Sequence, residues 1–255
     1  MKDGPLIPRF GRARRDPALA VLEGFHPVKH ALRFGARIEL LVTADPEELQ
    51  RLAGALAPDL GPRLAEAQVV DREVFDQLSP LAPTTPVMAI AERPHEEPAA
   101  MLASTHPAPV ILLEDPRDLG NMGACVRVAA AADAAGVLTT GTHDPWHPDA
   151  LRGAAGLHFA LPVARLENLE ELAGGGRPLL GLDPDGSPLH PGLLPPHSVL
   201  AFGTERHGLS DELTGRAQHL IRIPMREGVS SLNLATAVAA VLFAWRTATE
   251  AAREA

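Results

Sequence analysis

Short apolar runs alternate with segments of helical pattern along most of this chain of 255 residues, and this alternation limits its fold more than any other feature. After residue 109 the apolar runs are VILLE, VLTTG, PLLGLD, SVLAFG and HLIRIP, and the chain closes on a long helical pattern with Ser230 or Ser231 at its start. Runs of this length and composition suit buried parallel strands joined by helical crossovers. The sequence therefore predicts an α/β fold with a mostly parallel sheet.

A proline-rich segment divides the chain. Residues Glu92 to Pro109 contain four prolines and little hydrophobic periodicity, which predicts a linker at residues 93–108. Before it, helical patterns (EGFHPVKHALRFG, DPEELQRLAGAL, REVFDQLS) alternate with strand patterns (ARIELLVT, AQVV, TPVMAIAE). We expect a small α/β domain at residues 18–92, a larger one at 109–255, and a basic N-terminal tail at residues 1–17.

Charge and composition restrict the partners. The net charge of −9 argues against a uniformly basic, nucleic-acid-binding surface and leaves only local patches, such as Arg9, Arg12, Arg14 and Arg15. A solvated tail explains these four arginines equally well. The sequence has no signal-peptide pattern and no apolar run of the roughly 18 residues that a membrane span needs, so we expect a cytoplasmic protein.

Loops rich in glycine and polar residues follow three of the predicted strands: EDPRDLGNMGACVR, FGTERHGLS and IPMREGVSSLN. Open α/β sheets bind ligands at the carboxyl ends of their strands, so we expect these loops to form the functional site. In the first loop Asn121 is placed to cap a helix, with Arg127 inside it. In the second, Gly203 ends a strand, Glu205 follows, and Gly208 permits a tight return.

Each loop taken alone also has an ordinary structural explanation. Asn121 and the serines can be helix caps, the glycines can be turns, and Arg127 can pair with a surface carboxylate. Three such loops after three successive strands favour the functional interpretation.

Other reactive side chains form no consistent site. Cys125 has no evident histidine partner, and a lone helical cysteine is commonly a small buried residue. His143 and His147 are four residues apart, but Pro145 interrupts the helix that would place them on one face, so no metal site is predicted. Phosphate-binding motifs of the GxxxxGK and GxGxxG types are absent from the sequence.

The three loops together resemble the motifs of the SpoU (TrmH) family of RNA methyltransferases. NMGACVR is similar to the first motif, FGTERHGLS to the second, and IPMREGVSSLN to the third, in the family's order. Residues 18–92 resemble the RNA-binding domain that precedes the catalytic domain in larger family members. The resemblance implies a sheet of the SPOUT type with a C-terminal trefoil knot, which pattern alone does not predict.

By the same resemblance, the chain is a homodimeric enzyme that transfers a methyl group from S-adenosylmethionine to a ribose 2'-hydroxyl of structured RNA, rRNA in preference to tRNA. The residues that would hold the cofactor, chiefly through backbone groups, are Gly203, Thr204, Ile223, Pro224, Met225 and Leu232. The residues that match the polar catalytic positions are Asn121, Arg127, Glu205, Ser231 and Asn233.

Arg127 is the candidate for activating the hydroxyl. Because arginine stays protonated in proteins, we favour a role in which Arg127 binds a phosphate oxygen and a phosphate or water accepts the proton. Two other classes stay open: a non-catalytic RNA-binding or ribosome-assembly protein on the same fold, and a small-molecule enzyme on a doubly wound sheet. Binding of the cofactor would distinguish a methyltransferase from the RNA-binding protein. Dependence of the activity on RNA would distinguish it from the small-molecule enzyme.

Overall fold

The computed structural model describes residues 6–204 and 207–254. They form two compact units. Unit 1 runs to His95 and also includes Trp146–Ala160, whereas unit 2 holds Glu96–Pro145 and the chain from Leu161 onward. No helix in these ranges is both long and apolar enough to cross a membrane.

Unit 1 is a four-stranded sheet in the order β1-β4-β2-β3, in which β4 runs antiparallel to β1 and β2, and β3 runs parallel to β2. Its strands are β1 (Leu19–Glu23), β2 (Ile38–Thr43), β3 (Gln68–Val69) and β4 (Val87–Glu92). Its helices are α1 (Leu6–Ala13), α2 (Phe25–Arg33), α3 (Pro46–Leu56), η1 (Pro58–Leu60), α4 (Gly61–Leu64), α5 (Arg72–Asp76), α8 (Pro148–Gly153) and η2 (Leu157–Phe159).

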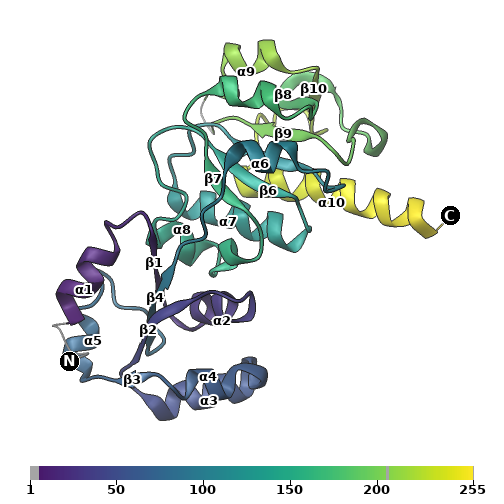
Figure 1. Cartoon of the computed structure of the whole chain (residues 1–255). Coiled ribbons are helices and arrows are strands. Elements are labelled where there is room, and N and C mark those ends of the chain that lie inside the picture. The colour runs from purple at the N-terminus through teal and green to yellow at the C-terminus, as the bar shows by residue number, and fades with distance from the viewer. Residues whose placement is uncertain (1–5, 205–206, 255) are drawn as a thin grey trace. The chain divides into compact units, whose positions relative to one another are not determined.

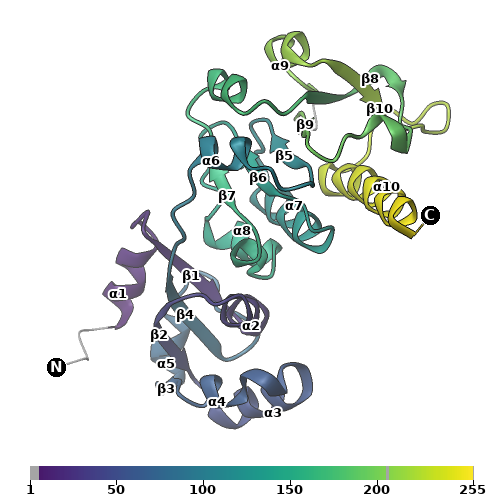
Figure 2. The same ribbon diagram turned by 45° about the vertical axis from the view of Figure 1, so that its right-hand side comes forward.

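Helices cover both faces of this sheet (Figures 1 and 2): α1 and α5 lie on one face, and α2, α3 and α4 on the other. Phe10 of α1 and Phe75 of α5 pack with Met88 and Ile90 of β4 in one buried cluster. The predicted N-terminal tail is therefore wrong for residues 6–13, because a helix with Phe10 and Ala13 on one side has an apolar face to bury.

The segment Trp146–Ala160 follows β6 in sequence but packs within unit 1. Gly156 has φ +76°, and a Cβ atom there would lie 2.4 Å from the carbonyl oxygen of Pro27, so only glycine allows this approach to α2. Arg152 of α8 pairs with Glu23, the last residue of β1. The sequence predicted one division of the chain, at residues 93–108. That division leaves Trp146–Ala160 with the C-terminal domain, whereas the structure places this segment in unit 1.

Unit 2 is a six-stranded sheet in the order β10-β8-β9-β5-β6-β7, and every neighbouring pair is parallel. The predicted mostly parallel sheet is confirmed. Its strands are β5 (Val110–Leu113), β6 (Gly136–Thr139), β7 (Val163–Arg165), β8 (Leu179–Pro188), β9 (Val199–Phe202) and β10 (His219–Arg222). Its helices are α6 (Pro98–Ala103), α7 (Leu119–Ala131), η3 (Leu169–Gly174), η4 (Pro191–Leu193), α9 (Asp211–Arg216) and α10 (Leu234–Glu254).

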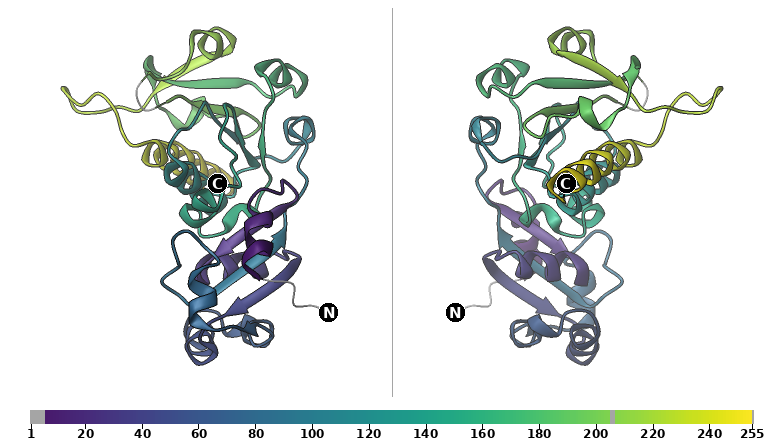
Figure 3. Two further views of the ribbon diagram at one scale, coloured as in Figure 1. Left: turned by 90° about the vertical axis from the view of Figure 1, so that its left-hand side faces the viewer. Right: turned by 90° about the vertical axis from the view of Figure 1, so that its right-hand side faces the viewer.

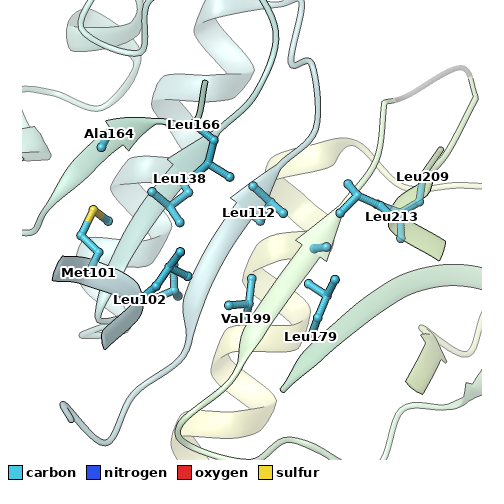
Figure 4. Packing of buried hydrophobic residues seen from close by; sticks show 12 residues of the cluster. Met101, Leu102, Leu112, Leu138, Ala164, Leu166, Leu179, Val199, Leu209 and Leu213 are labelled. Carbon is cyan, nitrogen blue, oxygen red and sulfur yellow. The ribbon is translucent and has the colours of Figure 1, made fainter. Parts of the chain in front are cut away.

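The core on one face of this sheet is formed by strand side chains such as Leu112, Leu138 and Val199, which Figure 4 shows beside Met101 and Leu102 of α6. The predicted linker at 93–108 therefore contains a helix of the fold, because both α6 side chains are almost completely buried. Helices α7 and α10 pack against each other.

Candidate functional site

The first loop joins β5 to α7. Asp118 is the N-cap of α7, and its carboxylate accepts a hydrogen bond from the backbone N–H of Asn121 at 2.6 Å. The prediction that Asn121 caps this helix is wrong, since the helix begins two residues before it. Asn121 instead lies in the first turn of α7.

A contact between two amides joins the first and third loops. Asn233 Nδ2 donates to Asn121 Oδ1 at 2.9 Å, across 112 residues of sequence. Asn233 Oδ1 accepts from the backbone N–H groups of Ala235 at 3.0 Å and Thr236 at 3.3 Å. Asn233 therefore has the capping role at α10 that was predicted for Ser230 or Ser231, and those serines lie exposed before it.

The second loop closes tightly on itself after β9. Thr204 and Gly208 exchange two backbone hydrogen bonds of 3.0 Å each. A Cβ atom at Gly203 would lie 2.0 Å from the carbonyl carbon of Gly208, and Gly208 itself has φ +65°, so the predicted glycine turn is confirmed. The candidate Glu205 lies outside the described residues.

Glu114, the residue after β5, ties the second loop to the first. Its Oε2 accepts from the backbone N–H of Ser210 at 2.8 Å, and its own N–H donates to Phe202 at 2.9 Å. Asp115 follows with φ +38°, a conformation that costs free energy in a residue with a side chain. The carboxyl ends of β5 and β9 are thus linked where the predicted site lies.

Sequence reasoning missed Glu114 and Asp118. Asp118 stands three residues before Asn121, and an N-cap side chain commonly accepts from the N–H group three residues after it. This spacing could have identified Asp118 as the cap. Glu114 gives no such signal, because its partner Ser210 is 96 residues away.

The third loop, residues 223–233, runs from β10 to α10 outside any helix or strand, and Figure 3 shows it extending away from the sheet. Met225 and Leu232 are 37% and 38% exposed. Pro224 and Ser231 are exposed as well, and Ile223 is half-buried. Of the residues predicted here, Asn233 alone has a hydrogen bond to the first loop within the described part of the chain.

Arg127 lies on α7, one helical turn after Gly123, and its side chain is exposed. The described residues 6–204 and 207–254 offer its guanidinium no ion pair or hydrogen bond. It is therefore available to an anionic ligand. Cys125, two residues before it, is buried.

In the part of the chain that the structure describes, no three His, Cys, Asp or Glu side chains are grouped so that they could hold a metal ion. The arrangement offers backbone groups of the second and third loops, two joined amides, and the exposed guanidinium of Arg127. Such groups bind and orient a polar, anionic substrate.

Known methyltransferases are similar to this chain over half of its length or more. It is 28% identical over 246 residues to a 23S rRNA (uridine(2479)-2'-O)-methyltransferase of Streptomyces viridochromogenes, covering 90% of this chain and 79% of that protein. An uncharacterized tRNA/rRNA methyltransferase of Synechocystis is 33% identical over 139 residues, which is 52% of this chain and 51% of that protein. The chain spans only about half the length of this second relative.

A solved structure gives the same result for the fold. The AdoMet-bound rRNA methyltransferase from Sinorhizobium meliloti superposes with a TM-score of 0.75 at 25% identity, covering 97% of this chain and 96% of that one. The model of the SpoU rRNA Methylase family matches residues 108–243, more than half of the sequence and all three loops. The chain is therefore a member of the SpoU rRNA methylase family.

Proposed function

We propose that this protein transfers the methyl group of S-adenosylmethionine to a ribose 2'-hydroxyl of rRNA. The observation that carries the proposal is the joining of Asn121 to Asn233 at 2.9 Å, within the family domain and on the same helix, α7, as the exposed Arg127. The relative from Streptomyces viridochromogenes supports the substrate, since its name specifies 2'-O-methylation of 23S rRNA.

The chemistry of the second and third loops fits S-adenosylmethionine. Residues 223–233 lie outside helices and strands, so their backbone groups can bind a ligand, and the exposed Met225 and Leu232 can cover an apolar ring. Gly203 and Thr204 would border this ligand from the second loop. When bound, S-adenosylmethionine supplies a methyl carbon attached to a sulfonium, which is open to attack by an oxygen nucleophile.

Arg127 would orient the nucleophile. Its guanidinium can bind a phosphate oxygen of the substrate with two parallel hydrogen bonds and so fix the adjacent ribose. Because the guanidinium stays protonated, the hydroxyl proton passes to a phosphate oxygen or to water. Asn121, held by Asn233, would line the same edge with Ser231 and Glu205.

A trefoil knot and a homodimer are part of the proposal. Strand β10 is at the sheet edge beside β8, whereas α10 packs on α7, where Arg246 Nη1 donates to the carbonyl oxygen of Ala132 at 2.9 Å. The chain therefore turns back past two strands after β10, as a knotted C-terminus requires. We place the protein in the cytoplasm. A second copy of the chain would complete the site, and it could cover four exposed apolar side chains: Met225, Val229, Leu232 and Phe243.

The first test is calorimetric titration of the whole protein with S-adenosylmethionine, with and without unmodified rRNA. Wild type should bind the cofactor. A folded protein that binds none under either condition would contradict the methyltransferase proposal and favour an RNA-binding protein without catalysis.

The second test is transfer of a radiolabelled methyl group to rRNA and tRNA transcripts. Arg127→Ala should lower the transfer rate by about 100-fold or more, as loss of a charged positioning group does, with cofactor affinity unchanged. Arg117→Ala is the matched control, since Arg117 is exposed in the same loop and pairs with Asp115 at 3.2 Å. Resistance of the labelled linkage to alkali would identify the ribose oxygen as the acceptor. Preference for tRNA would correct the substrate.

A further inference from the structure

Glu114 contacts the second loop at both of its ends. Its backbone N–H donates to the carbonyl oxygen of Phe202, the last residue of β9, at 2.9 Å. Its side-chain Oε2 accepts from the backbone N–H of Ser210 at 2.8 Å, where the loop leads into α9. The loop therefore leaves β9 and enters α9 beside one residue, which stands at the carboxyl end of the neighbouring strand β5.

Ser210 is the point at which this loop becomes a helix. Its Oγ accepts from the backbone N–H of Leu213 at 3.2 Å, and its carbonyl oxygen accepts from Thr214 at 2.9 Å. Both acceptors of Ser210 thus serve α9, and its N–H serves Glu114. Leu213 is completely buried in the core of unit 2 (Figure 4), so the loop is attached to a helix that the core holds in place.

The contacts within the second loop fix its shape. Thr204 and Gly208 exchange two backbone hydrogen bonds, and Thr204 Oγ1 accepts from the N–H of His207 at 3.1 Å. Gly203 approaches Gly208 too closely for a Cβ atom. These contacts lie inside the loop, whereas the Glu114 carboxylate joins the loop to another strand end. Loss of that carboxylate should leave the shape of the loop and change its position.

The chain bends directly after Glu114. Asp115 has φ +38°, its N–H donates to Thr140 Oγ1 at 3.0 Å, and its carboxylate pairs with Arg117 at 3.2 Å. A strained conformation of this kind persists where surrounding contacts hold it. Of the two consecutive carboxylates, Asp115 is therefore used within the first loop, and Glu114 is directed to the second.

The hydrogen bond between Glu114 and Ser210 lies near the surface, since Glu114 is half-buried and Ser210 is exposed. A hydrogen bond that water can replace adds little to the stability of a fold. It can still decide where a loop lies, and small displacements of a loop at a binding site weaken ligand binding strongly. This contact is therefore better suited to placing the loop than to stabilising unit 2.

We infer that Glu114 is a positioning residue for the cofactor, which holds the second loop so that Gly203 and Thr204 lie where they border S-adenosylmethionine. The inference rests on the proposed function for the identity of this ligand. Glu114 acts as a hydrogen-bond acceptor for the N–H of Ser210 and not through its charge, so an amide at this position can replace the carboxylate.

The test is the dissociation constant of the full chain for S-adenosylmethionine by calorimetry, with KM and kcat for methyl transfer to a 23S rRNA transcript. Glu114→Ala should raise the dissociation constant and KM of the cofactor by about tenfold and leave kcat within about twofold. Glu114→Gln keeps an acceptor and should stay within about threefold of wild type. Glu212→Ala is the matched control, because Glu212 is exposed in the first turn of α9 and pairs with Arg216 at 2.8 Å.

Ser210 provides a second, independent variant. Ser210→Pro removes the N–H that Glu114 accepts, and the backbone φ of −66° at this position suits proline. Ser210→Ala removes the capping hydroxyl but keeps the N–H, so it is the control for loss of the cap. Cofactor binding should weaken in Ser210→Pro as in Glu114→Ala, with no further loss when the two are combined. Ser210→Ala should bind as wild type does.

The outcomes separate this inference from the proposed function. Wild-type cofactor affinity in folded Glu114→Ala and Ser210→Pro would overturn the inference and leave the proposed function intact. Equal losses in Glu114→Ala and Glu114→Gln would also overturn it, since the charge would then be the group that matters. A lower kcat at unchanged KM would contradict a role in cofactor positioning. Absence of cofactor binding by folded wild type would contradict the proposed function and the inference together.

Discussion

Both units bury a charged side chain, but the partners that stabilise the charge differ between the two units. In unit 1, Glu23 at the end of β1 is 4% exposed and has cationic partners. Arg14 Nη2 donates to its Oε1 at 2.5 Å, Ser79 Oγ donates to the same oxygen at 2.8 Å, and Arg152 pairs with Oε2. A buried carboxylate is thus compensated by two guanidinium groups from distant segments.

In unit 2, Arg177 is 5% exposed and interacts with backbone carbonyls instead. Its nitrogens donate to Leu102 at 3.2 Å and to Ser104 and Ala108 at 2.8 Å. Burial lowers the pKa of this guanidinium. Backbone carbonyl dipoles satisfy the donors of Arg177. Among the residues that the structure describes, no carboxylate pairs with it.

The partners of Glu23 and Arg177 differ in which segments of the chain they hold together. A carboxylate accepts from several directions, so Glu23 can join Arg14 after α1, Ser79 and Arg152 of α8, which lie far apart in sequence. A planar guanidinium with five donors fits a run of carbonyls, so Arg177 fixes the single stretch from α6 to β5. Loss of Glu23 partners should loosen the assembly of unit 1, and loss of Arg177 should free one segment of unit 2.

The two tryptophans allow the units to be followed separately. Trp146 is 3% exposed in unit 1 and Trp245 is 6% exposed in unit 2. In Trp245→Phe and Trp146→Phe backgrounds, fluorescence during urea unfolding reports one unit each. This separation matters because a chain of two units need not unfold in one step.

Arg177→Met should have the largest effect on stability. It removes this donor from the carbonyls of Leu102 and Ala108, whose bonds to Arg177 are buried, at a cost of about 3 kcal/mol in the unfolding free energy of unit 2. The carbonyl of Ser104 keeps His197 Nε2 as a partner at 2.8 Å. The Trp245 signal should detect the change and the Trp146 signal should not. Arg177→Lys, which keeps fewer donors, should lie between Met and wild type. Equal stability of all three would mean that the carbonyls find other partners.

Arg14→Met should have the next largest effect, about 2 kcal/mol in unit 1, because Glu23 keeps Arg152 and Ser79 as partners. Arg12→Met, at an exposed position in the last turn of α1 two residues before Arg14, should change the stability by less than about 0.5 kcal/mol. The Trp146 signal measures both. Matching losses at residues 12 and 14 would show that α1 is stabilised by helix propensity and not by the buried pair.

A pH dependence should follow from His30. Since burial holds its pKa below the ordinary value of 6.5, the folded chain binds fewer protons than the unfolded chain when the pH falls through 6.5. Unit 1 should therefore lose stability from pH 7.5 to 5.5, by less than either arginine substitution costs. His30→Gln should flatten the difference relative to wild type. An unchanged slope in that variant would assign the dependence to another group.

Arg127→Met should have the smallest effect on unfolding, within about 0.5 kcal/mol of wild type, because its side chain is exposed. The same substitution at Arg177 and Arg127 then separates an arginine that stabilises the fold from one that is available to a substrate. A loss in unit 2 stability comparable to that of Arg177→Met would contradict a purely functional role for Arg127.

Sequence reasoning predicted the elements whose signals are local. Apolar runs marked β5, β6, β8, β9 and β10, and glycines marked the turn after β9. It missed β1, because Leu19–Glu23 runs directly into the helical pattern of α2. Both misplaced caps have one cause: several residues near each helix start could cap it, and only the tertiary position of the chain selects Asp118 or Asn233.

The interactions that join distant segments had no local signal. Arg152 is 129 residues from Glu23, and Arg177 is 75 residues from Leu102. Which residues meet at such separations depends on the topology of the fold, and the spacing of residues along the sequence does not specify that topology. The Asn121–Asn233 contact could be expected only from the family resemblance, because each asparagine also suits a helix cap.

The return of Trp146–Ala160 to unit 1 bears on how such a chain can be divided. A fragment that begins at Glu96 would keep every strand of unit 2 but would carry α8 without β1, against which it packs. Trp146 and Leu151, buried in the intact protein, would then meet water and invite aggregation. Exchange of the N-terminal unit between relatives, by recombination or in the laboratory, would have to carry this segment along as a second inherited piece.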